Sequence, residues 1–283
     1  MKNMEKPQEN KKKSYGLLAV GAILTIASIA LTVYTYHSYY LASRQENILA
    51  EQKLALERPY SYSLILLFAA VMLTLRGLYK ALIGSAPAGK DHIKRLAQAG
   101  LLAALCYIGF AFFKIDIPVG PEKTSFHFGN VFCVLAALLL GGYWGGLAGA
   151  IGMTIGDLTT SYVTSAPKTF VLKLCIGLIV GFVGHKILKL SRDHSPKYVT
   201  GATILASVCG MGFNIVADPL VGYFYKTYLL GVPQDISRAL AKMGAITTFV
   251  NAVVAVVAAS VFYLALRPAL KKSGLFVQLD EET

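Results

Sequence analysis

The stretch FHFGNVFCVLAALLLGGYWGGLAGAIGMTIGD, from Phe126 to Asp157, decides the fold of this chain. It overlaps an uncharged run from Thr124 to Gly156, which would be about 50 Å long as one helix because an α-helix rises ~1.5 Å per residue. The hydrocarbon core of a membrane is only about 30 Å thick. We therefore expect two short membrane helices, roughly Phe128–Gly141 and Gly145–Tyr162, with a break in the glycine cluster between them.

Composition and charge place the whole chain in a membrane. Of its 283 residues, 55% are hydrophobic and only 15% are charged, and the apolar residues form long blocks between short charged stretches, unlike those of a soluble core. The formal charge of +12 comes mostly from Lys and Arg beside these blocks, where basic residues keep a loop in the cytoplasm. We therefore expect a multi-pass protein of the plasma membrane that binds no nucleic acid.

The apolar blocks predict an all-α fold with eight spans in total. In chain order the spans are Ser14–Ser43, Pro59–Leu75, Leu96–Phe113, the two short helices above, Lys168–Lys186, Tyr198–Val216 and Met243–Leu266. The basic tail and the first two spans form an N-terminal hairpin domain, residues 1–85, which precedes a six-helix domain, residues 86–272, and a short tail, residues 273–283. The basic loops place both termini in the cytoplasm.

No cofactor or metal is expected from the sequence. The four cysteines each stand alone in apolar segments, without the paired spacing of a zinc site or a disulfide framework. The segment GSAPAGKD, Gly84–Asp91, is close to a phosphate-binding loop, but Asp91 replaces the hydroxyl residue that holds magnesium, and no strand precedes the segment. We therefore interpret it as a basic cytoplasmic linker.

Polar side chains inside the spans are the best indication of function, because they are costly in a membrane unless they are paired, hydrated or bound to a ligand. Under the predicted topology they converge on the extracytoplasmic half, where a protein that captures a solute from outside would build its pocket. The candidate substrate-binding residues are His127, Asn130, Asp157, Lys168, Lys173, Asn214, Asp218 and Asn251.

Structural roles are the alternatives for these residues. The side chains of Lys168 and of Lys242 could instead extend to the membrane interface. Asp218 could mark a helix end, and His127 and Asn130 could cap or bridge helices. Lys173 lies more than one turn into its short helix and needs a counter-charge or a polar ligand. A pair between Lys173 and Asp157 would satisfy that need without any ligand.

Small residues suggest a surface for contact with another membrane helix. Ala99 and Ala103 lie four residues apart on one face of the third span and form a flat stripe that suits another membrane helix. Packing inside the protein is the alternative use of the same stripe.

The stretch from Phe126 to Asp157, followed by SAPKTFVLKLCIGLIVG from Ser165 to Gly181, resembles the substrate-capture (S) components of energy-coupling-factor (ECF) vitamin transporters, specifically the riboflavin-transporter-like group. The resemblance covers about Lys90–Lys272. It implies a six-helix vitamin-binding protein, not an enzyme, that works with a transmembrane coupling subunit and two cytoplasmic ATPases. It also implies that Ala99 and Ala103 face the coupling subunit, and that the loop Lys114–Ser125 covers the substrate.

The N-terminal hairpin is a departure from the six helices of that family. The substrate also stays open between a riboflavin-like compound, a pyridoxine-like or pyrimidine precursor, and pantothenate, since lysines suit an anionic group and aromatic side chains suit a ring. Two other classes of function compete. One is an intramembrane enzyme acting on lipid through His127, Asp157 and Asp218, although no DxxD or HExxH spacing supports it. The other is a stand-alone secondary carrier, although no inverted repeat is evident.

Overall fold

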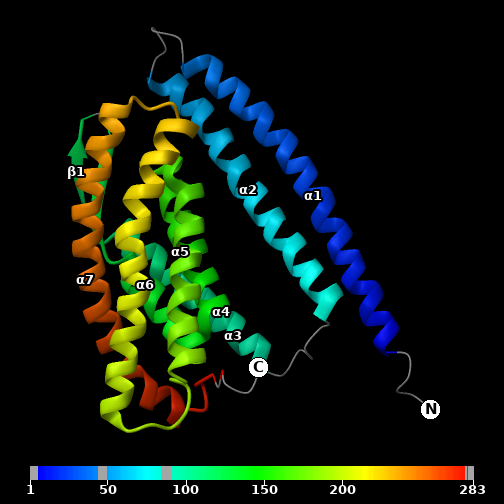
Figure 1. Ribbon diagram of the computed structural model, residues 1–283, viewed down its shortest axis with the longest axis vertical. Coiled ribbons are helices and arrows are strands. Elements are labelled where there is room, and N and C mark those ends of the chain that lie inside the picture. The colour runs from blue at the N-terminus through cyan, green and yellow to red at the C-terminus, as the bar shows by residue number, and fades with distance from the viewer. Residues whose placement is uncertain (1–5, 44–49, 84–90, 121, 278, 280–283) are drawn as a thin grey trace. The chain divides into compact units, whose positions relative to one another are not determined.

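The computed structural model describes residues 6–43, 50–83, 91–120, 122–277 and 279 (Figure 1). The chain forms two compact units, residues 1–89 and residues 90–283. Among the described residues, six helices are long and apolar enough to cross a membrane, which confirms the prediction of a polytopic, mainly helical protein. The domain boundary predicted after residue 85 and most of the phosphate-loop-like segment fall in residues 84–90, outside the described residues.

The first unit is a hairpin of two long helices. They are α1 (Lys6–Ser43) and α2 (Ala50–Ile83). Their antiparallel pairing is tied by hydroxyl contacts of 2.9 Å between Thr25 and Thr74 and of 2.8 Å between Thr35 and Ser63. These bonds keep hydroxyl groups satisfied where water is scarce. The six candidate spans do not include α2, although the predicted second span falls within it.

The second unit contains five helices and a small sheet. In chain order its elements are α3 (Asp91–Ala111), β1 (Lys114–Val119), β2 (Glu122–His127), α4 (Gly129–Thr159), the 3₁₀ turn η1 (Val163–Ser165), α5 (Ala166–Gly181), the π-helical turn η2 (Phe182–Ile187), α6 (Pro196–Phe224), a second π-helical turn η3 (Tyr225–Leu229) and α7 (Gln234–Lys272). In Figure 1, α5, α6 and α7 run side by side along this unit.

The deciding stretch folds as predicted into two helical arms, both assigned to α4. The backbone of Gly141 leaves the helical region at φ 79° and ψ 177°, and the chain reverses there. A Cβ atom on Gly145 would lie 2.3 Å from the Cα of Ala137, and one on Gly149 would lie 2.3 Å from the Sγ of Cys133. Only glycine permits this approach, so the cluster both breaks the helix and packs its two arms against each other.

The segment Lys114–Ser125, which the resemblance implies to be a loop over the substrate, forms most of a β-hairpin. Lys114 pairs with His127, and Val119 pairs with Glu122 across the two antiparallel strands. The turn between them includes Gly120 at φ 61°. Ile115, Ile117 and Val119 occupy every second position, with Asp116 and Pro118 between them, and this spacing is the period-two pattern of a strand. This spacing predicts a strand, which the expected all-α fold does not include.

Three details of the predicted helices need correction. His127 is the last residue of β2 and does not share a helix with Asn130, because the fourth span begins at Gly129. Helix α6 continues through Asp218 and Pro219 to Phe224, so Asp218 does not mark a helix end. Helix α7 likewise begins well before the predicted eighth span, at Gln234. These extensions bring more polar residues to the end of the bundle that carries the β-hairpin.

The segment after α7 folds back onto the opposite end of the unit. The Lys94 ammonium donates to the carbonyl of Gly274 at 2.6 Å, and the Gln98 side chain donates to the carbonyl of Leu275 at 2.8 Å. Val277 is buried. This part of the predicted tail therefore belongs to the folded unit.

Candidate substrate-binding site

A polar cavity lies below the β-hairpin and between α4, α5, α6 and α7. It is open to water molecules over a volume of ≈ 120 Å³. All the predicted substrate-binding residues line it: His127, Asn130, Asp157, Lys168, Lys173, Asn214, Asp218 and Asn251. The reversal at Gly141 explains how Asn130 and Asp157 meet, because it returns the end of α4 to the level of its start.

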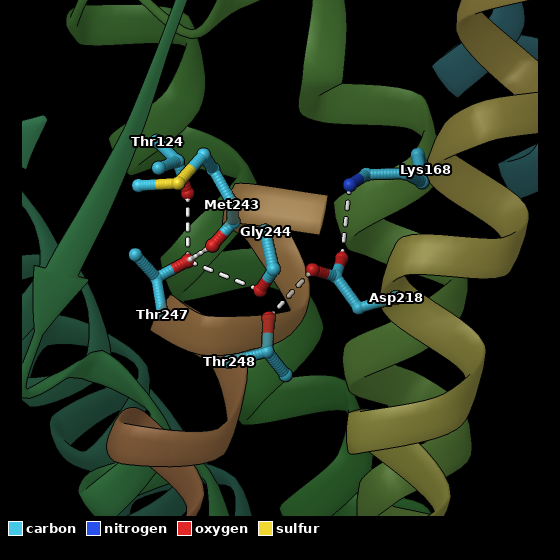
Figure 2. Close-up of polar contacts among 7 residues, drawn as sticks. All are labelled: Thr124, Lys168, Asp218, Met243, Gly244, Thr247 and Thr248. Atoms are coloured by element: carbon cyan, nitrogen blue, oxygen red, sulfur yellow. Dashed lines mark hydrogen bonds and ion pairs between the residues drawn. The ribbon is translucent and has the colours of Figure 1, made fainter. Parts of the chain in front are cut away.

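Asp218 joins three helices at one side of the cavity. Its Oδ1 accepts a hydrogen bond from the Lys168 ammonium at 2.9 Å, and its Oδ2 accepts one from the Thr248 hydroxyl at 2.9 Å (Figure 2). Lys168 comes from α5, Asp218 from α6 and Thr248 from α7. A charge in an apolar environment is tolerated when it is paired and hydrogen-bonded, so this network fixes the three helices around the cavity.

Asn251 ties α7 to the strand that roofs the cavity. Its Oδ1 accepts a hydrogen bond from the backbone N–H of His127 at 3.0 Å, and its Nδ2 donates to the carbonyl of Ser125 at 3.0 Å. Both bonds reach β2. Asn251 therefore lines the cavity but uses its amide oxygen and one amide hydrogen to hold the hairpin.

Two further contacts hold the hairpin over the cavity. The hydroxyls of Thr124 and Thr247 lie 2.8 Å apart, and Thr247 in turn donates to backbone carbonyls of its own helix (Figure 2). Glu122 forms an ion pair with Lys226 of η3. Sequence reasoning missed Thr124, Thr247 and Lys226 as site residues. Lys226 carries a recognisable signal, since it is a lone charge in the aromatic run YFYKTY.

Several buried polar atoms around the cavity have no hydrogen-bond partner within the described part of the chain. They are Nδ1 of His127, Oδ1 of Asn130, Oδ2 of Asp157 and Oδ1 of Asn214. Asn130 and Asp157 are each 2% exposed and Asn214 is 1% exposed. A buried acceptor without a donor costs roughly 1–3 kcal/mol, so the site is built for groups that it does not itself supply.

Lys173 is a buried cation of the site without an ion pair among the described residues. It is 6% exposed, and among the described residues its ammonium forms no ion pair, with Asp157 or with any other carboxylate. The alternative of a structural pair between Lys173 and Asp157 is therefore not what the structure shows. A ligand acceptor or anion would complete the coordination of this ammonium.

Aromatic side chains close the side of the cavity next to α3. The ring of Phe110 lies edge-on to the ring of His127, with centroids 4.9 Å apart, and 5.8 Å from the ring of Tyr162. The Tyr162 hydroxyl donates to Asp116 of β1 at 2.8 Å. Burial and the neighbouring Asp116 raise the pKa of this phenol above its usual value, so it stays a neutral donor. This wall suits the flat face of a ring.

The cavity shows no arrangement for metal binding within the described residues. No three His, Cys, Asp or Glu side chains there lie close enough together to hold an ion. The four cysteines are free thiols.

The predicted alanine stripe points into the protein. Ala99 is only 7% exposed, and a Cβ atom on Gly152 of α4 would lie 2.1 Å from the carbonyl oxygen of Ala103. Burial of Ala99 and partial burial of Ala103 favour the alternative of internal packing for this face, and its contact with a coupling subunit stays a prediction. The exposed small residues of α3 are Ala97, Gly100 and Ala104, and the last two lie one position further along the helix than Ala99 and Ala103.

Comparison with known proteins gives the same assignment over most of the chain. Residues 90–268 match the family described as the ECF-type riboflavin transporter, S component. An uncharacterized protein in the gap 3' region of Pyrococcus woesei is 29% identical over 108 residues, which are 38% of this chain and 69% of that protein. A UPF0397 protein of Enterococcus faecalis is 32% identical over 98 residues, 35% of this chain and 52% of that protein, so the chain spans about half of its length.

No solved structure matches this chain. The family match covers the unit that holds the cavity and leaves out the N-terminal hairpin. An S component is a substrate-binding subunit of a transporter and not an enzyme. The chain therefore belongs to the S components of the ECF-type riboflavin transporter family.

Proposed function

We propose that this protein captures a vitamin or vitamin precursor at the extracytoplasmic side of the plasma membrane and delivers it inward by ATP-driven transport. The observation that carries the proposal is the roofed cavity, in which, among the described residues, three buried side-chain oxygens lack a hydrogen-bond partner and the Lys173 ammonium forms no ion pair. In an empty site these groups are costly, and a bound solute with complementary groups would repay that cost. The eight predicted residues are the proposed substrate-binding set, with Asn251 acting through the hairpin.

The unpartnered groups describe the solute. The oxygens of Asn130, Asp157 and Asn214 need N–H or O–H donors, whereas the Lys173 ammonium needs a carbonyl, carboxylate or phosphate oxygen. A ring that carries both kinds of group would fit beside Phe110. Riboflavin and pyridoxine-like or pyrimidine compounds offer such a ring. Pantothenate offers hydroxyls and a carboxylate without one.

The proposed partners are a transmembrane coupling subunit and two cytoplasmic ATPases. Gly100 and Ala104 form an exposed small-residue face on α3, which allows close approach by a helix of another subunit. Both termini are proposed to lie in the cytoplasm, since Lys186, Lys189 and Lys197 all lie at the end of the bundle away from the β-hairpin.

The decisive experiment identifies the solute directly. The full chain is purified in mild detergent and denatured, and released small molecules are identified by mass spectrometry. Thermal-shift titrations with riboflavin, pyridoxine and pantothenate run in parallel on the wild type, on Lys173→Met, and on Thr159→Ala as a control, whose hydroxyl bonds only within its own helix. We expect one compound to stabilise the wild type and the control but not Lys173→Met.

The competing classes of function give different results. Uptake into vesicles without any coupling subunit or ATPase would identify a stand-alone carrier. Turnover of a membrane lipid by the purified protein would identify an enzyme. A protein that releases no solute and responds to none of a wider vitamin panel would contradict the capture proposal.

A further inference from the structure

A second, open groove lies on the surface of the bundle, between the last turns of α6 and the first turns of α7. Its volume is ≈ 560 Å³. Helix α6 contributes Val216, Leu220 and Tyr223, and α7 contributes Arg238 and Lys242. The groove is therefore apolar along one helix and cationic along the other.

The two cations of the groove are available to a ligand. Arg238 and Lys242 are four residues apart, so they share one face of α7, and both are exposed. Within the residues that the structure describes, neither forms an ion pair, and Asp235, one turn before Arg238, is not bridged to it. Asp218 directly precedes Pro219 of the groove, but its two carboxylate oxygens accept hydrogen bonds from Lys168 and Thr248.

The groove combines the residue types that proteins place at the boundary between headgroups and hydrocarbon. Arg238 and Lys242 lie in the first turns of α7, close to the end of the bundle that carries the cavity. Tyr223 lies at the same end of α6 and is followed by the stacked rings of Phe224 and Tyr228, 5.9 Å apart, which is typical of an interfacial aromatic belt. Leu220 and Val216, 54% and 66% exposed, continue along α6 toward the membrane interior.

We propose that this groove binds an anionic phospholipid, with its phosphate between Arg238 and Lys242 and an acyl chain along Val216 and Leu220. Charge complementarity favours a phosphate, and the apolar continuation favours an attached chain over a free ion. A partner helix of ordinary apolar composition would leave both cations without a counter-charge. The proposal does not depend on which solute the central cavity holds.

The groove shares a wall with the central cavity. Pro219 and Ala241 line both. A lipid in the groove would therefore support the wall of the solute site from outside. We expect bound lipid to raise the melting temperature of the protein, because a ligand that binds only the folded state stabilises it.

The test counts lipids on the full chain by native mass spectrometry, after exchange into detergent with phosphatidylglycerol or phosphatidylcholine. We expect one phosphatidylglycerol to be retained by the wild type. The double variant Arg238→Gln/Lys242→Gln should bind it about tenfold or more weakly, since each basic residue contributes to attraction of an anionic headgroup. The control Lys186→Gln/Lys197→Gln removes the same charge from exposed positions at the other end of the bundle and should retain the lipid.

A second variant separates a lipid from a free phosphate. Leu220→Trp fills the groove and keeps both cations, so it should weaken lipid retention, and Val216→Phe serves the same purpose if Leu220→Trp does not fold. Inorganic phosphate should not displace the lipid from the wild type. Equal retention by the wild type and Arg238→Gln/Lys242→Gln, equal loss in the Lys186→Gln/Lys197→Gln control, or full displacement by inorganic phosphate would overturn the proposal.

Discussion

The backbone N–H of His127 donates to the side-chain oxygen of Asn251 across 3.0 Å, which joins the last residue of the β-hairpin to the middle of α7. The same side chain donates to the carbonyl of Ser125. Asn251 thus holds the roof of the cavity through two hydrogen bonds, beside the contacts of Thr124 with Thr247 and of Glu122 with Lys226. Any ligand below the hairpin is retained only while these bonds, or others like them, persist.

Asn251→Ala should weaken solute binding mainly by speeding release. Removing two hydrogen bonds of roughly 0.5–1.5 kcal/mol each predicts a dissociation constant about tenfold higher, and a loosened roof raises the off-rate more than it lowers the on-rate. Stopped-flow binding measures both rates. Asn251→Asp keeps the acceptor for His127 but loses the donor to Ser125, and should fall between the wild type and Asn251→Ala. An unchanged off-rate in Asn251→Ala would show that the hairpin does not control release.

Lys173 and Lys168 should respond differently to the same substitution. Lys173→Met removes an unpaired buried cation, so we expect solute affinity to fall by tenfold or more while the melting temperature stays equal or rises. Lys168→Met leaves Asp218 without its 2.9 Å partner and should cost roughly 3 kcal/mol of stability as well as affinity. Thermal unfolding and isothermal titration on both variants check this. A loss of stability in Lys173→Met larger than that in Lys168→Met would contradict the assignment of roles.

The sequence was informative wherever one residue type has one strong physical consequence. The glycine cluster around Gly141 predicted the reversal of α4, and the cost of burying polar groups in a membrane predicted that Asn130 and Asp157 would gather at one end. Both inferences depend only on where a helix breaks and on how far along the bundle axis each residue lies. Neither needs the rotation of a helix about its own axis.

Rotation is what the sequence left undetermined. Lys168 and Lys173 are five residues apart and so point about 140° away from each other, and only the packing of α5 decides which one meets Asp218. In α3, a rotation of about 100° separates the buried Ala99 from the exposed Gly100. From the sequence, Ala99 with Ala103 and Gly100 with Ala104 are equally good candidates for a small-residue stripe on the surface of α3. Tertiary contacts, here Gly152 against Ala103, make the choice.

The exposed face of α3 gives a prediction about the coupling subunit. Gly100→Leu and Ala104→Leu add bulk where a Cβ on Gly100 meets no other atom, so each should leave the isolated protein stable and able to bind solute. Each should reduce co-purification with the coupling module, and uptake, by tenfold or more. Ala99→Leu, by contrast, overfills a buried position and should cost about 1–3 kcal/mol of stability. Normal association of both exposed-face variants, together with a stable but uncoupled Ala99→Leu, would return the interface to the original stripe.

His127 gives the protein a defined response to acid. Burial, together with the nearby Lys173 and Lys114 and against the attraction of Asp218, lowers the pKa of its imidazole to about 3, compared with about 6.5 in an unfolded chain. The unfolded state therefore binds more protons below pH 6.5. The contribution of His127 to stability is fully present above pH 6.5 and is lost as the pH falls from 6.5 toward 3. Near pH 5 the loss is at most about 2 kcal/mol.

The comparison with His127→Gln isolates this effect. Melting temperatures measured in detergent at pH 7.5 and pH 5 should fall more for the wild type than for the variant, because glutamine does not titrate. A neutral imidazole also means that solute affinity should not change through His127 between pH 8 and pH 5.5, since its unpartnered Nδ1 keeps the same protonation state throughout. Equal acid sensitivity of the two proteins, or a binding transition near pH 6.5 that disappears in His127→Gln, would show that His127 is accessible to protons and that the roof is more open than the contacts of Asn251 indicate.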